Sequence, residues 1–255
     1  MDVTGTHDWN PSAAELHRAF GEIVASLGGT VLDAEVAGSV MYARATLPAV
    51  ADVRRGDLVQ GGVAVRVVEG EVFVHPFILR QVCTNGAVRT YAVGTRVVER
   101  VDAPARVAAA QRPAIEAVLS AFEEAVRHAA APERFADGVR EMQSAIDIRA
   151  TAAIERLHLR ALLLALPEQG LAGELRRAMW PLLSRALTAG VDGDRSAYAF
   201  GNAVTAAARD AGNPAIRWAM EEYGAAVFGA TILEHSPPRA AAWHPASPPQ
   251  STEGR

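Results

Sequence analysis

The sequence predicts an α+β protein with a curled antiparallel sheet and flanking helices in its N-terminal half and a helical C-terminal half. From residue 30 to 101, apolar and polar side chains tend to alternate, as they do in half-buried strands. After residue 102, apolar residues recur every three or four positions, the period of an amphipathic helix. We therefore expect an α+β domain over 1–101, a helical region over 102–235 that packs on it or forms a subdomain, and a disordered tail over 236–255.

The first element should be a helix. Ser12 precedes an apolar stripe at helical spacing, and Glu15 follows three residues later, as in a capping box. Gly28-Gly29 should end this helix. Strands are then expected over Thr30–Val36, Ser39–Leu47, Leu58–Glu69 and Glu71–His75, and one or two more over Ala87–Val101. Pro48 should close the second strand, and Gly61-Gly62 indicates a bulge or a close approach of two backbones in the third.

The segment Glu71–Gly86 combines several signals. Its first residues read as a strand, and Pro76 is well placed to begin a helix that ends at Asn85-Gly86. Arg80 would then lie inside an apolar helix, where a buried guanidinium needs an acid or a ligand as its partner. Arg80 is therefore the residue of this segment that we most expect to have a function.

The C-terminal half should be helical. One stripe runs from Ile115 to Val126, and Pro132 should form a turn between antiparallel helices. The next stripe, Phe135–Leu164, predicts a single long helix. Three shorter helices are expected around Glu174–Thr188, over Ala197–Ala211 with Asp194 or Ser196 as its cap, and over Ala215–Phe228 after Asn213-Pro214.

Composition excludes several classes of protein. All 25 basic residues are Arg, which fits a GC-rich genome, and the net charge of −4 gives no global signal for nucleic acid or membrane. No secretory signal and no apolar run of membrane-spanning length is visible, so we expect a cytoplasmic protein. The single cysteine, the scattered histidines and the lack of a phosphate-binding glycine loop point to no metal and no cofactor.

No catalytic signature is present, and the sequence leaves open whether the chain is an enzyme. Cys83 and His75 could form a nucleophilic pair, although a buried structural cysteine is the simpler interpretation. A polar stripe along one predicted helix could bind a ligand or form a hydrogen-bonded seam between helices. Its members are Tyr198, Asn202, Thr205 and Arg209.

Arginines in the β-rich half could contact the phosphates of a nucleic acid. The candidates are Arg44, Arg54, Arg55, Arg66 and Arg80, with Tyr42, Phe73, Phe77 or Tyr91 as stacking surfaces. The alternative is an ordinary solvated sheet face, which composition alone favours.

Several segments, in their order along the chain, resemble the phage/plasmid-related protein family of unknown function. They are Met41–Arg44 with Leu47-Pro48, Gly56–Val63, Phe77–Gly86, Asn202–Thr205 and the helix Trp218–Phe228. The most specific is the run Arg-x-x-Cys-Thr-Asn-Gly that begins at Arg80. The chain departs from the family at Val65–Gly70, where a longer hairpin containing Ser and Gly is expected.

The layout of that family is similar to the core of the single-strand annealing recombinases of phages. The resemblance thus implies a protein that binds single-stranded nucleic acid as a homo-oligomer, in annealing or recombination, and needs no catalytic residue. Two alternatives stay open: an interaction protein that engages a host factor through its helical half, and an enzyme that uses Cys83 or the Asn202 stripe.

Overall fold

The computed structural model describes residues 11–68, 71–81, 85–88, 97–98, 111–157, 181 and 194–229. The N-terminal elements are α1 (Ala13–Ser26), β1 (Thr30–Ala37), β2 (Val40–Arg54), β3 (Asp57–Val68), β4 (Glu71–Arg80), β5 (Asn85–Val88) and β6 (Val97–Val98). The helices that follow are α2 (Gln111–Ala129), α3 (Pro132–Ser144), α4 (Ala150–Leu157), α7 (Ala197–Ala208) and α8 (Pro214–Gly229). None of these described helices has the length and hydrophobicity of a membrane span.

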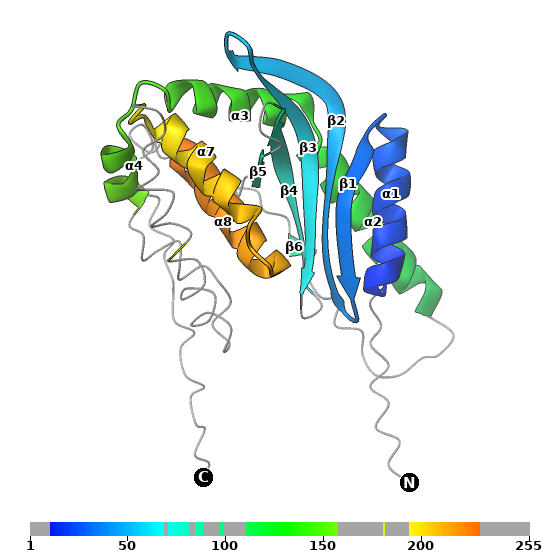
Figure 1. Ribbon diagram of the computed structural model, residues 1–255. Helices are drawn as coiled ribbons and strands as arrows, with labels where there is room; N and C mark the ends of the chain where they lie inside the picture. Colours follow the sequence, from blue (N-terminus) through cyan, green and yellow to red (C-terminus); the bar gives the residue numbers. More distant parts are fainter. Residues whose placement is uncertain are drawn as a thin grey trace, which may run out of the picture.

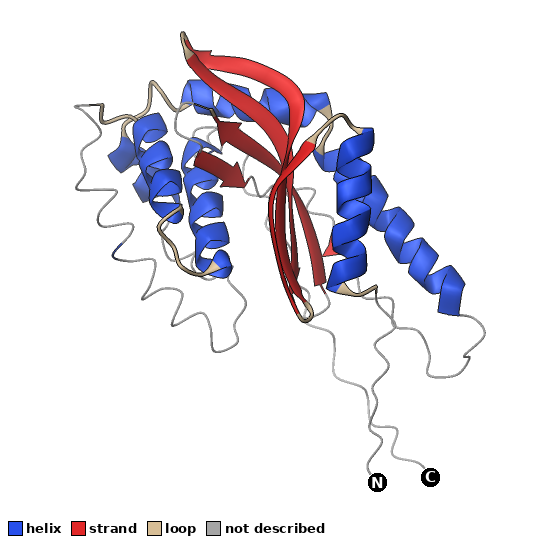
Figure 2. Ribbon diagram, turned by 45° about the vertical axis from the view of Figure 1, so that its right-hand side comes forward, coloured by secondary structure: helices blue, strands red, loops and turns tan. Residues whose placement is uncertain are grey.

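The strands form one antiparallel sheet in the order β1-β2-β3-β4-β5, and β6 also pairs with β4. This confirms the predicted α+β class, with an open sheet in place of the curled one that we expected. Figure 2 shows the sheet between two groups of helices, with α1 and α2 on one side and α7 and α8 on the other. Helix α3 crosses one end of the sheet (Figure 1), where it contacts β2, β4 and α8.

The layer between the sheet and α1 is apolar because the alternation of the strands matches the period of the helix. Ser12 caps α1 as predicted: its hydroxyl accepts from the Glu15 amide at 3.2 Å, and the Glu15 carboxylate accepts from the Ser12 amide at 2.8 Å. The helix then buries Leu16, Phe20 and Val24 among alternate residues of β2, β3 and β4. These strand residues are Met41, Ala43, Ala45, Val63, Val65, Val67, Val72 and Val74.

Strand β2 does not end at Pro48 as predicted but continues to Arg54. Its register with β3 shifts between Thr46 and Val50, so the proline sits in a bulge where the hydrogen-bond ladder is already interrupted. The predicted close approach at Gly61-Gly62 is confirmed. A Cβ atom on Gly62 would lie 2.0 Å from the Ala45 carbonyl oxygen.

The predicted helix between Pro76 and Gly86 is wrong, because β4 continues through Pro76 to Arg80. Residues on both sides of β4 decide this: Phe77 to Arg80 pair with β3 on one edge and with β5 on the other. Pro76 lies between the stretches of β4 that pair with β6 and β5, where a residue without an N–H group is tolerated. Cys83 lies outside the described residues.

The stripe Phe135–Leu164 does not form one helix; it is divided between α3 and α4, and its last residues lie outside the described part. The start of α7 interrupts it. The Tyr198 amide donates to the Ala145 carbonyl at 3.0 Å, and the Ala150 amide donates to the Arg195 carbonyl at 2.8 Å. Helix α3 also packs against β2 and α8, whereas α2 packs against α1 and β4, so the two are not the antiparallel pair that we expected.

The local signals at the starts of the last two helices are confirmed. The Ser196 hydroxyl accepts from the Ala199 amide at 3.1 Å, and the Asn213 carbonyl side chain accepts from the Ala215 amide at 2.8 Å. Pro214 takes the first position of α8. The helix predicted around Glu174–Thr188 and the predicted tail lie outside the described residues, apart from a single helical position at Pro181.

Two glycine variants should change stability in opposite directions. Gly62→Ala forces β2 and β3 apart, and we expect it to lower the free energy of unfolding by more than about 2 kcal/mol. Gly21→Ala, inside α1, places its methyl group where nothing lies within 4 Å, and we expect it to raise that free energy by up to about 1 kcal/mol. Urea unfolding measures both, and equal effects would contradict the assigned packing.

Candidate functional site

The face of the sheet that meets α8 carries charged and aromatic side chains. Alternation along β2 explains this, because Met41, Ala43 and Ala45 point toward α1, so Tyr42 and Arg44 point toward α8. Arg66 on β3 pairs with Tyr42 and therefore lies on the same face. This face positions most of the polar groups discussed below.

Arg44 is the centre of an ion-pair network, which we call the Arg44 network, with Asp33 of β1 and with Glu221 and Arg217 of α8. Its Nε atom donates to Asp33 Oδ1 at 2.8 Å, its Nη2 atom donates to Asp33 Oδ2, and its Nη1 atom donates to Glu221 Oε1. Arg217 joins the two acids, with Nε 3.3 Å from Glu221 Oε1 and Nη1 3.5 Å from Asp33 Oδ2. The network thus fastens α8 to the two strands at this edge of the sheet.

Burial makes this network energetically important. Arg44 is 6% exposed and Glu221 only 1% exposed. Burial raises the pKa of the Glu221 carboxyl, against the charges of Arg44 and Arg217, which lower it. Removing either partner would leave the other charge in the interior without compensation.

A stack of rings lies beside the network. The Arg66 guanidinium lies 4.4 Å from the Phe73 ring centroid and 5.6 Å from that of Trp218, while His75 stacks against both rings. The Trp218 indole donates to Glu222 at 2.6 Å. Burial, aided by the charge of Arg66, lowers the pKa of His75 from 6.5 to about 4, and its Nε2 atom has no hydrogen-bond partner.

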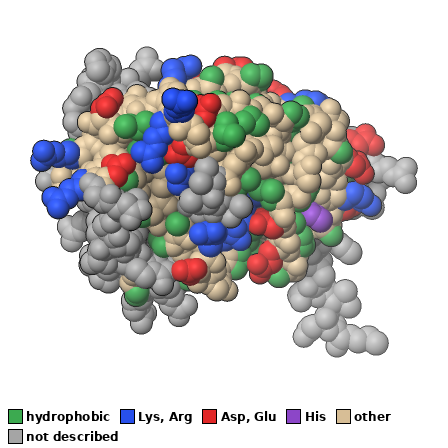
Figure 3. Space-filling view, turned by 45° about the horizontal axis from the view of Figure 1, so that its top comes forward, with side chains coloured by type: hydrophobic (Ala, Val, Ile, Leu, Met, Phe, Trp, Pro, Cys, Tyr) green, Lys and Arg blue, Asp and Glu red, His purple; other side chains and the backbone are tan. Residues whose placement is uncertain are grey.

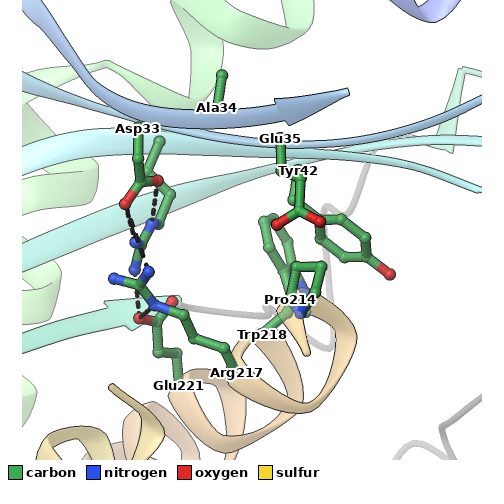
Figure 4. Close-up of a pocket in the computed structure, with 9 residues that line it drawn as sticks. Asp33, Ala34, Glu35, Tyr42, Pro214, Arg217, Trp218 and Glu221 are labelled. Carbon is green, nitrogen blue, oxygen red and sulfur yellow. Dashed lines mark hydrogen bonds and ion pairs between the residues drawn. The ribbon is translucent and has the colours of Figure 1, made fainter. Parts of the chain in front are cut away.

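A pocket of about 130 Å³ opens between β1 and the start of α8, as shown in Figure 4. The Arg44 network forms one wall, and Glu35, Tyr42, Pro214 and Trp218 form the other. Glu35 pairs with Tyr42 across the two strands, and its exposed carboxylate makes no hydrogen bond or ion pair within the described part of the chain. The pocket therefore offers both donors and acceptors around one aromatic side chain that stays partly accessible, Tyr42.

A second pocket, of about 260 Å³, is almost entirely apolar. It lies above the bulge of β2, between the end of α1 and the link from α2 to α3, and is bordered by Pro48, Gly61, Pro76, Pro132 and Phe135. It brings together none of the residues that we predicted to be functional.

Asp57 is the partner that Arg80 requires. Arg80 donates to it through Nε at 2.6 Å and Nη2 at 2.8 Å, and the Tyr198 hydroxyl donates to it at 2.7 Å. Burial opposes ionisation of Asp57, but these donors outweigh it and lower the pKa of the carboxyl below its ordinary value. Burial and the bond to Asp57 raise the pKa of Tyr198 to about 12. This arrangement ties α7 to the ends of β3 and β4.

Four arginines, which we call the tip arginines, surround the end of the β2–β3 hairpin: Arg54, Arg55, Arg149 and Arg195. Arg54 reaches Asp57 at 3.3 Å and Asp194 at 3.5 Å. The other three are exposed, and their side chains form no ion pair or hydrogen bond with any described residue. Figure 3 shows basic side chains on this face more densely over the side of α4 and α7, with acidic ones between them.

The polar stripe on α7 lies mostly inside the helix pair that α7 forms with α8. The Asn202 amide donates to the Tyr198 carbonyl at 2.9 Å, and the Thr205 hydroxyl donates to the Asn202 carbonyl at 3.1 Å. Thr205 packs so closely on Gly224 that a Cβ atom there would lie 2.4 Å from its methyl group. Only Arg209, at the end of the helix, is exposed, so the geometry is that of an inter-helix seam.

The five predicted phosphate contacts therefore have different surroundings. Arg44 and Arg80 bind buried carboxylates, and Arg66 is stacked between rings, whereas Arg54 and Arg55 lie at the open hairpin tip. Of the predicted stacking residues, Tyr42 and Phe73 are partly exposed, Phe77 is buried, and Tyr91 lies outside the described residues.

The sequence interpretation did not single out Asp33, Asp57, Glu221 or Trp218. One signal could have identified Glu221. It belongs to a helix otherwise rich in Ala, Met and aromatic residues, where an acid at a buried position requires a basic partner. Within the described chain, no three His, Cys, Asp or Glu side chains gather in a way that could hold a metal ion.

Removing the positive charge of Arg44 should be far more costly than removing that of Arg54. We expect Arg44→Met to lower the free energy of unfolding by about 3 kcal/mol or more, because Asp33 and Glu221 lose their shared partner. Arg54→Met, at a side chain that is 50% exposed, should cost less than about 1 kcal/mol. Denaturant unfolding of the two variants measures the difference, and equal losses would show that the Arg44 network does not hold α8.

His75 should make the protein less stable in mild acid. Its pKa is depressed in the folded state, so the unfolded chain takes up a proton first as the pH falls below 6.5. We expect a loss of about 2 kcal/mol from this residue between pH 7 and pH 5, and continued loss down to about pH 4. His75→Gln should flatten this part of the stability profile, and His17→Gln, on the partly exposed face of α1, should not. A profile unchanged in His75→Gln would refute the assignment.

Comparison with known proteins finds no matching family model, no curated protein and no solved structure.

Proposed function

We propose that this protein binds single-stranded nucleic acid without catalytic chemistry, as in strand annealing or recombination. The observation that carries the proposal is the group of tip arginines. Arg55, Arg149 and Arg195 come from three separate segments, are exposed, and have no acidic partner among the described residues. Unpaired guanidinium groups suit phosphate oxygens, which they can contact through two parallel hydrogen bonds.

Pairing within the fold holds these arginines in one region. Arg149 forms a β-bridge with Ser196, which follows Arg195 directly. Arg54 reaches Asp194, which precedes Arg195, so the hairpin tip and the start of α7 lie together. The backbone at these positions is fixed by hydrogen bonds, while the side chains stay free to meet a ligand.

This arrangement changes which residues we propose for the phosphate contacts. Arg44 and Arg80 already have acidic partners, so their positive charges are not available to a polyanion. The proposed contacts are therefore Arg54, Arg55, Arg149 and Arg195. With a net charge of −4, binding would depend on this local cluster and would weaken steeply with salt.

The proposal includes self-association, as the resemblance to annealing proteins implies. Strand β1 pairs only with β2, so its outer edge presents backbone groups to a strand of another chain. Leu32 and Val36 on this strand are 43% and 39% exposed. The same edge would serve the alternative function, contact with a host protein. Light scattering separates the two, because a monomer at every concentration would favour the alternative.

Replacing tip arginines should weaken binding to single-stranded DNA. For the double variant Arg55→Ala/Arg195→Ala we expect lower affinity for labelled oligothymidylate and a salt slope smaller by about 2, one for each lost phosphate contact. The matched control is Arg18→Ala/Arg127→Ala, which removes the same charge from α1 and α2 on the other side of the sheet.

Fluorescence anisotropy over a salt series measures both quantities. The proposal fails if the native protein does not bind at low salt, if its binding does not depend on salt, or if the two double variants lose affinity equally.

A further inference from the structure

The pocket between β1 and α8 holds chemistry that phosphate contacts do not use. Its lining includes three acids, Asp33, Glu35 and Glu221, against two arginines, Arg44 and Arg217. This excess of negative charge opposes a phosphate group. A neutral ligand with its own donors and acceptors would not meet this repulsion.

One wall can accept hydrogen bonds. Glu35 is exposed, and both of its carboxylate oxygens are without partners among the described residues. It lies opposite Tyr42 on the neighbouring strand and faces the pocket beside Pro214 (Figure 4). A carboxylate in this state binds best to two N–H donors that lie side by side.

The other wall can donate. Arg217 uses Nε for Glu221 and Nη1 for Asp33, and its Nη2 atom has no partner among the described residues. The side chain is 34% exposed, so it can meet a ligand without leaving its acids. Arginine binds neighbouring oxygen and nitrogen acceptors at the edge of a purine through this kind of fork.

Size restricts the ligand to a single ring system. The pocket volume of about 130 Å³ is close to that of the roughly 150 Å³ cavity that takes a benzene molecule in another protein. Tyr42 lies against Trp218 with 6.0 Å between ring centroids, and Tyr42 keeps part of its surface open to solvent. An aromatic side chain of this kind stacks on an unpaired base.

Guanine matches both walls better than any other base. Its N1–H and N2 amine donate side by side, as the Glu35 carboxylate requires, and its O6 and N7 atoms accept from an arginine such as Arg217. Adenine and cytosine have one amine next to an acceptor, and the N3–H of thymine lies between two carbonyl oxygens that the carboxylate would repel.

We propose that the pocket lined by Glu35, Tyr42, Arg217 and Trp218 holds one unstacked guanine base of a bound single strand. The inference rests on the proposed nucleic-acid function and adds a preferred base to it. Phosphates would lie on the tip arginines, and the base would enter between β1 and α8.

Calorimetric titration with guanosine, adenosine, cytidine and thymidine tests the pocket apart from the phosphate contacts. We expect the native protein to prefer guanosine by about tenfold or more, the range that one bidentate contact to a base gives. Glu35→Gln should remove most of this preference. The matched control Glu71→Gln changes an exposed glutamate at the start of β4, away from the pocket, and should keep it.

The same proteins are then titrated with oligothymidylate that carries either one guanine or one adenine. Tighter binding of the guanine strand, lost in Glu35→Gln, supports the inference. A native protein with no guanosine preference, or a Glu35→Gln variant that retains it, overturns the inference even if oligothymidylate binds. Guanosine preference without binding of any oligonucleotide supports the pocket and overturns the proposed function.

Discussion

The buried guanidinium of Arg44 is the constraint on which the arrangement of the sheet and α8 depends. A positive charge at this depth is stable only with carboxylates around it, and the fold provides one from β1 and one from α8. Because ion pairs and hydrogen bonds need defined directions, they fix where α8 crosses the strands more narrowly than apolar contacts do. The apolar layer under α1 on the other face imposes no such direction.

The position of α8 then determines the rest of that face. Trp218 lies one turn before Glu221, so the ion pair also places the indole ring over Arg66 and His75. The ring stack excludes water from His75, which explains why its imidazole stays neutral well below the ordinary range. Charge, ring stacking and the adjoining pocket are thus consequences of one docking geometry, and a shift of α8 would disturb all three.

Signals that act within a few residues were predictable from the sequence, and those that act across the fold were not. The caps at Ser12, Ser196 and Asn213 depend on neighbours in the chain, and they are present. The segment after Pro76 has an apolar composition that suits a helix or a strand equally, and its pairing with β3 and β5 decides between them. The partner of Arg80 was expected on electrostatic grounds, which hold in a strand as well as in a helix, but the identity of Asp57 needed the structure. Glu221 lies 177 residues from Arg44, and no local pattern connects them.

The division of the arginines bears on any polyanion that this surface could bind. Arginines on the sheet faces are neutralised by acids, whereas those in turns and loops are not, so the number of arginines in the β-rich half overstates its attraction for phosphate. What matters is where unpaired charge remains. Arg44, which borders the base pocket, and Arg54, at the hairpin tip, are separated along β2 by a distance on the order of 30 Å at 3.3 Å per residue. A strand that used both regions would have to follow the hairpin, so contacts along it would set the length of nucleic acid bound by one chain.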